Sequence, residues 1–75
     1  MFNNLIFISI FHKDSTIPIQ NKVALRIDDE KDFFGVVAFQ FFKDYCNQNN
    51  LNVHAYKFKF YIKNQGTFYE LKKVT

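Results

Sequence analysis

The chain has 75 residues and a mass of 9.0 kDa, which leaves room for one small domain and excludes a multidomain enzyme. The net charge of +3 and the pI near 9.1 allow an acidic partner but are mild for a dedicated nucleic-acid-binding protein. Phe, Tyr, Met, Ile, Asn and Lys make up 40 of the 75 residues, which indicates AT-rich coding bias, and eleven Phe and four Tyr provide large side chains for a core.

Cysteine usage and hydropathy indicate an intracellular protein. Cys46 is the single cysteine, so an internal disulfide is excluded and a reducing compartment, cytoplasmic or nuclear, is expected. The longest apolar runs, residues 5–8 and 36–39, are far shorter than the roughly 20 residues of a membrane span. The first four residues also lack the positive charge of a secretory signal. We therefore expect no membrane partner.

Two strands are predicted in the first part of the chain. Residues 5–11 are β-branched and aromatic at both alternating sets of positions, a pattern typical of a central strand. Residues 12–16 are polar and predict a turn. Residues 17–19 and 23–27 predict an interrupted second strand, and Pro18 favours an edge position because proline cannot donate a ladder hydrogen bond.

A helix is predicted from the acidic residues near Asp28 to about Gln48. Asp28 or Asp29 can accept hydrogen bonds from the free amides of the first turn. At about 100° per residue, one broad stripe becomes apolar and is expected to face the core. Its members are Phe34, Val37, Ala38, Phe41, Phe42 and Tyr45. Asn49 or Asn50 can adopt the left-handed conformation that ends a helix.

Residues 56–63 show the clearest strand pattern, with strict alternation of apolar and mainly basic side chains. Residues 64–66 predict a short hairpin loop, and residues 67–74 predict a final strand. The inward set is Tyr56, Phe58, Phe60 and Ile62, and the outward set is Lys57, Lys59, Tyr61 and Lys63.

The order strand, strand, helix, strand, strand predicts an α+β fold in which one helix packs on one face of a mixed sheet. The β-grasp arrangement of ubiquitin-like proteins is the best-known fold with this ββαββ order. Residues 1–75 lack an internal repeat or a linker and are interpreted as a single small domain.

Part of the chain resembles the small ubiquitin-like modifiers. The quoted residues are Lys43-Asp44-Tyr45-Cys46, then Leu51 and Val53, then Lys57-Phe58-Lys59-Phe60, within about 18 residues. They are similar to the helix end and third strand of that family. The predicted helix is longer than in the family, the predicted loop before the last strand is shorter, and no C-terminal Gly-Gly is present, so conjugation is not expected.

The resemblance implies recognition of an extended apolar peptide beside the second strand, in a groove closed by the helix. The residues that correspond to that strand include Val23 and Leu25, with Lys22 and Arg26 as basic flanks. The helix pattern adds Phe33, Val36 and Phe39, which lie outside or at the edges of the core stripe. Such a shoulder can serve a protein partner or a homodimer, or it can belong to an extended core.

The outward residues Lys57, Lys59, Tyr61 and Lys63 form the best candidate for a nucleic-acid interface. Lysines neutralise phosphates, and an exposed aromatic ring offers a surface on which a base can stack. The alternative is a solvated strand face whose lysines guard against edge pairing.

No pattern predicts a catalytic, cofactor or metal site. Cys46, His54 and His12 are the reactive side chains, but no activating motif surrounds them, and one cysteine with two histidines does not supply a closed zinc site. Gly35 and Gly66 stand alone and form no phosphate loop.

The sequence therefore predicts a protein without enzymatic activity. The leading interpretation is a protein-interaction module, such as an adaptor, a modifier-like protein or a small inhibitor. The alternative is a small RNA- or DNA-binding protein, which can be part of a ribonucleoprotein.

Overall fold

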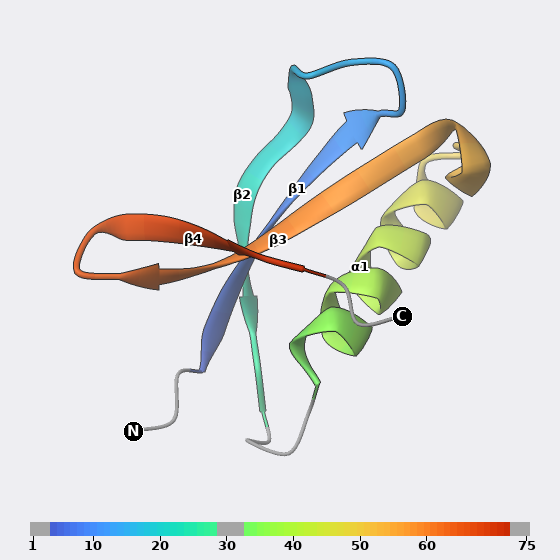
Figure 1. Cartoon of the computed structure of the whole chain (residues 1–75). Coiled ribbons are helices and arrows are strands. Elements are labelled where there is room, and N and C mark those ends of the chain that lie inside the picture. Colours follow the sequence, from blue (N-terminus) through green and yellow to red (C-terminus); the bar gives the residue numbers. More distant parts are fainter. Residues whose placement is uncertain (1–3, 29–32, 73–75) are drawn as a thin grey trace.

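The computed structural model describes residues 4–28 and 33–72, which form one sheet and one long helix (Figure 1). The predicted α+β class and element order are confirmed. The sheet has the strand order β2-β1-β3-β4, so β1 is internal and β2 lies at an edge, as their sequence patterns predict. The elements are β1 (Leu5–His12), β2 (Pro18–Arg26), α1 (Phe34–Gln48), the short 3₁₀ helix η1 (Val53–Ala55), β3 (Tyr56–Asn64) and β4 (Thr67–Leu71).

Every strand pairing in the sheet is antiparallel, so the prediction of a mixed sheet is wrong. β1 pairs antiparallel with both β2 and β3, and β3 pairs antiparallel with β4. The helix does connect two parallel strands, β2 and β3, but β1 lies between them. No parallel ladder can form between β2 and β3 because these two strands are not neighbours in the sheet.

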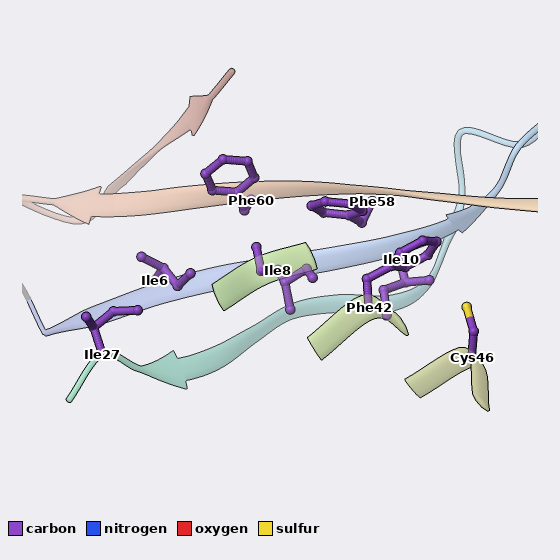
Figure 2. Close-up of a cluster of buried hydrophobic side chains, with 9 residues drawn as sticks. Ile6, Ile8, Ile10, Ile27, Phe42, Cys46, Phe58 and Phe60 are labelled. Atoms are coloured by element: carbon purple, nitrogen blue, oxygen red, sulfur yellow. The ribbon is translucent and has the colours of Figure 1, made fainter. Parts of the chain in front are cut away.

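The core lies between α1 and one face of the sheet (Figure 2). Alternate side chains of β1 and β3 point towards the helix, and residues four apart on α1 point back. The ring centres of Phe42 and Phe58 are 4.9 Å apart. Gly35 lies beside the Phe60 ring at the start of the helix, where an added Cβ would make an ordinary van der Waals contact at 3.5 Å. The buried cluster consists of Ile6, Ile8, Ile10, Ile27, Ala38, Phe42, Cys46, Phe58 and Phe60.

Helix α1 begins later than the acidic residues predict. Its N-cap is Phe33, which provides no side-chain hydrogen bond. The prediction that Asp28 caps the helix is wrong, because Asp28 lies before the helix start and its carboxylate is 3.9 Å from the Arg26 guanidinium. Asp29, the alternative cap, lies outside the described residues. At the other end, Asn50 adopts the left-handed conformation with φ of 55°, as predicted.

The hairpin between β3 and β4 has the expected tight loop. Asn64 pairs with Thr67, and the two residues between them, Gln65 and Gly66, have φ of 51° and 82°. Two positive φ values suit the right-handed twist of the flanking strands. β4 ends at Leu71, so Lys72 of the predicted strand lies outside β4, and predicted strand residues 73 and 74 lie outside the described residues. The described part of the chain contains no helix with the length and apolar character of a membrane span.

Candidate nucleic-acid interface

The sheet face opposite α1, which we call the open face, has no helix of the described residues against it (Figure 1). Cross-strand partners share a face, so the side chains of this face follow from the register. Phe7 is opposite Tyr61, Phe11 is opposite Lys57, and Lys63 is opposite Phe68. The open face carries Phe7, Ser9, Phe11, Lys22, Arg26, Lys57, Lys59, Tyr61, Lys63, Phe68 and Glu70.

Three aromatic rings from three strands meet on this face and form what we call the aromatic cluster: Phe7, Tyr61 and Phe68. The Phe7 and Phe68 rings are edge to face, with centres 5.1 Å apart, and those of Tyr61 and Phe68 are 6.3 Å apart. All three side chains are half-buried although no second layer covers the sheet here. They form a second apolar contact region, separate from the core.

Lysine side chains lie over these rings. The Lys22 ammonium is 5.2 Å from the ring centre of Tyr61 and 5.4 Å from that of Phe68, and the Lys63 ammonium is 5.3 Å from Phe68. Their methylene stems can cover apolar surface while the charges stay in water. The open face therefore presents cations directly above aromatic rings.

A second group of lysines covers Phe11. The ammonium groups of Lys57 and Lys59 are 5.9 and 5.7 Å from its ring centre, and Phe11 itself is only 7% exposed. Phe11 is therefore too well covered to contact a ligand, whereas the two lysines above it are available.

Basic side chains outnumber acidic ones on the open face. The basic side chains on it are Lys22, Arg26, Lys57, Lys59 and Lys63. The Glu70 carboxylate is 3.9 Å from the Lys59 ammonium, and the Asp28 carboxylate is 3.9 Å from the Arg26 guanidinium. Lys22, Lys57 and Lys63 have no carboxylate within salt-bridge distance among the described residues.

Lys22 reaches the aromatic cluster because the β2 backbone is irregular beside it. The register between β1 and β2 shifts between Ile8 and Ile10, and Lys22 has a left-handed φ of 50°. Ser9, which is 0% exposed, holds this bulge. Its hydroxyl accepts a hydrogen bond from the Lys22 backbone N–H at 2.9 Å and donates one to Asn21 Oδ1 at 3.2 Å.

The residues predicted to bind a peptide beside the second strand are divided between the two faces of the sheet. Val23 and Leu25 pack against the core, whereas Lys22 and Arg26 lie on the open face. Alternation along a strand separates neighbours in this way. The basic flanks therefore belong to the open face and not to the helix side of β2.

The predicted shoulder of α1 is exposed. Phe33 is 78% exposed, Val36 64% and Phe39 47%. The Phe39 ring centre is 6.2 Å from that of Phe58, which places Phe39 over β3. β1 lies between β3 and β2 in the sheet.

The reactive side chains are not brought together. Cys46 is buried in the core, and burial raises the pKa of its thiol. His12 accepts a hydrogen bond from the Asp14 backbone N–H and contacts the Tyr56 ring, while the backbone N–H of His54 donates to the Asn52 side chain. Within residues 4–28 and 33–72, no three His, Cys, Asp or Glu side chains gather as metal ligands would.

Sequence reasoning placed Lys57, Lys59, Tyr61 and Lys63 on one outward face, and the structure puts all four on the open face. It missed the contributions of Phe7 and Phe68 and the role of Lys22. The alternation in residues 5–11 and 67–71 carried a signal for the two phenylalanines, because each lies on the opposite side of its strand from the core positions. The position of Lys22 had no such signal, because it depends on the bulge.

Comparisons with protein families, curated proteins and solved structures gave no match to this chain.

Proposed function

We propose that this protein binds nucleic acid through the open face of its sheet. The observation that carries the proposal is the placement of Lys22 and Lys63 ammonium groups directly over the Tyr61 and Phe68 rings. Lysines bind the phosphates of a nucleic acid, and aromatic rings offer a surface on which its bases can stack. No enzymatic step is part of this proposal.

The charge distribution supports a polyanionic ligand over an apolar one. The basic side chains of the open face come from β2 and β3, and a backbone phosphate chain can contact several of them at once. If Lys22, Lys57, Lys59 and Lys63 each neutralise one phosphate, the logarithm of the affinity should fall with the logarithm of salt concentration with a slope of about −3.

The test is fluorescence anisotropy of a labelled oligonucleotide at several salt concentrations between about 50 and 200 mM. We expect Lys63→Gln to weaken binding and to make the salt slope shallower by about 0.7 to 0.9, because one phosphate contact is lost. Lys43→Gln is the matched control, since Lys43 lies on α1 near Phe39 and away from the open face. Equal effects of the two substitutions would contradict the proposal.

Glu70→Gln is expected to increase the affinity for nucleic acid, a result that impaired folding of the variant would not produce. Removing this carboxylate from beside Lys59 leaves the positive charge of the lysine uncompensated. We expect tighter binding by several-fold at low salt and convergence with the unsubstituted protein at high salt. Asp44→Gln on α1, where the carboxylate accepts a hydrogen bond from the Gln40 amide, is the control and should leave affinity unchanged.

A protein partner is the second candidate, and two observations favour it. β2 is an edge strand with Ile19 45% exposed, and the α1 shoulder exposes Phe33 and Val36. A relationship to the β-grasp and small ubiquitin-like proteins belongs to this candidate. The shared features are the ββαββ order and the helix on one face, while the antiparallel sheet departs from the mixed arrangement.

Titration with hydrophobic, acid-flanked peptides tests this second candidate. Strand addition at β2 should shift the backbone amide resonances of residues 22–27, because the added strand hydrogen-bonds to that edge. Use of the shoulder for a homodimer should instead appear as a doubled mass in sedimentation. Unshifted amides together with a monomeric mass would exclude both uses.

A further inference from the structure

The three rings of the aromatic cluster are half-buried, and lysine ammonium groups lie over two of them. The Lys22 ammonium lies over both Tyr61 and Phe68, and Lys63 lies over Phe68 from a neighbouring position. A flexible side chain that rests on a ring in this way can leave it. The rings are therefore covered by movable cations and not by fixed parts of the fold.

Hydrogen bonds hold the Lys22 backbone, and the Lys22 ammonium itself donates a hydrogen bond to Asn21 Oδ1 at 3.3 Å on the exposed surface. Buried Ser9 hydrogen-bonds to the Lys22 backbone N–H and to the Asn21 side chain, which holds the bulge in one conformation. The side chain thus starts from a defined point on β2 and crosses β1 to reach Tyr61 on β3. It can move from the ring to a nearby phosphate without any change of the sheet.

A base that replaced the ammonium would gain the larger contact. An exposed cation over a ring contributes less than a base stacked on an aromatic side chain. The displaced Lys22 ammonium would keep a favourable partner, because each base brings its own phosphate. A stacked base and a bound phosphate together replace the ring contacts of Lys22 and its hydrogen bond to Asn21 Oδ1, which favours a nucleic acid whose bases are free.

Bases in a duplex are stacked on one another, so their faces cannot reach Tyr61. In a single strand the bases can turn out of the stack and lie on a protein ring. β3 adds further phosphate contacts at a spacing of about 6.8 Å, because Lys57, Lys59, Tyr61 and Lys63 alternate along an extended strand.

We propose that the open face is specific for single-stranded RNA or DNA. An unpaired base stacks on the Tyr61 ring in place of the Lys22 ammonium, and Lys22, Lys59 and Lys63 bind the adjoining phosphates. This inference rests on the proposed function and adds to it the class of ligand and the residue that distinguishes single strands from duplexes.

The first test compares a single-stranded oligonucleotide with the duplex of the same sequence at one salt concentration. We expect the single strand to bind at least about tenfold more tightly. Oligo-dU, oligo-U and oligo-dT form the arms that separate RNA from DNA. Equal binding of single strand and duplex would overturn this inference but leave nucleic-acid binding standing, whereas no binding of either at low salt would overturn both.

The second test substitutes Tyr61. Tyr61→Phe keeps the ring and should bind single strands as before, while Tyr61→Leu keeps apolar volume without a ring and should lose about tenfold or more on single strands. Duplex binding should change little in either variant. Unchanged single-strand affinity of Tyr61→Leu would contradict the stacking role.

A measurement on the unsubstituted protein removes dependence on the folding of Tyr61→Leu. Addition of the single strand should shift the Tyr61 ring proton resonances upfield, as expected for a ring under a stacked base, and should shift the Lys22 side-chain resonances as the ammonium leaves the ring. Addition of an acidic peptide is the control for charge alone. Identical shifts with both ligands would rule out base stacking.

Discussion

Ser9 is the polar residue on which the arrangement of the open face depends. It is fully buried, and its single hydroxyl serves as donor to Asn21 and acceptor from Lys22. Lys22 occupies a left-handed backbone conformation that costs energy for a residue with a Cβ. The hydrogen bonds from Ser9 offset that cost and direct the Lys22 side chain across the sheet.

Ser9→Ala should therefore destabilise the fold and also weaken binding. Loss of the hydroxyl leaves the buried Lys22 N–H without its partner, at a cost of about 1 to 3 kcal/mol in the free energy of unfolding. Urea denaturation followed by circular dichroism measures the loss. Thr16→Ala, at an exposed loop position, is the control and should change stability by less than about 0.5 kcal/mol.

Helix α1 is held by its buried face and not by its N-terminus. Its first turn has no acidic residue and no side-chain cap, because Phe33 occupies the N-cap position. Ala38, Phe42 and Cys46 are buried against the sheet and supply the packing that a capped, isolated helix would otherwise need. The exposed ring of Phe33 contributes little to that packing.

Phe33→Asp should raise stability by about 1 kcal/mol, because the carboxylate can accept a hydrogen bond from a free amide and interacts favourably with the helix dipole. Phe33→Ala is the matched control, since it removes the ring without adding a cap. Thermal unfolding compares the two. If Phe33→Asp unfolds the protein, Phe33 belongs to the core, in contrast to its 78% exposure.

At the scale of the whole molecule, one helix covers one side of a four-stranded sheet, and the core is correspondingly thin. A chain of 75 residues has a stability of about 4 to 11 kcal/mol at the usual 0.05 to 0.15 kcal/mol per residue. Lysine stems and the aromatic cluster cover part of the second face, which has no other layer in the described structure. Stability and ligand binding therefore use opposite faces of the same sheet.

Ile8→Ala tests how much of the free energy of unfolding depends on this core. Ile8 is fully buried at the centre of the helix-covered face, and its truncation should cost about 2 to 5 kcal/mol, a large share of the total. We expect a marked fall in the thermal midpoint or a loss of folding at 37 °C by circular dichroism. Ile17→Ala, at a position that is 76% exposed, should leave the midpoint nearly unchanged.

Local periodicity determined much of the molecule. Apolar residues on both sides of residues 5–11 predicted an internal strand, alternation in residues 56–63 predicted the buried side of that strand, and helical spacing predicted that Phe42 packs inward. These features depend only on how neighbouring side chains are directed along one element, so the sequence by itself contains them. The predicted helix start was wrong because acidic residues before an apolar stripe indicate an N-cap whether or not the helix begins there.

Only the tertiary structure decided which strands are neighbours. Periodicity assigns Tyr61 to a face of β3 but does not say that β1 and β4 lie beside it. The order β2-β1-β3-β4 brings Phe7, Phe68 and Lys22 together with Tyr61 on one face. The physical reason is that strand order and register depend on pairing between distant segments and on a bulge, which no local pattern encodes.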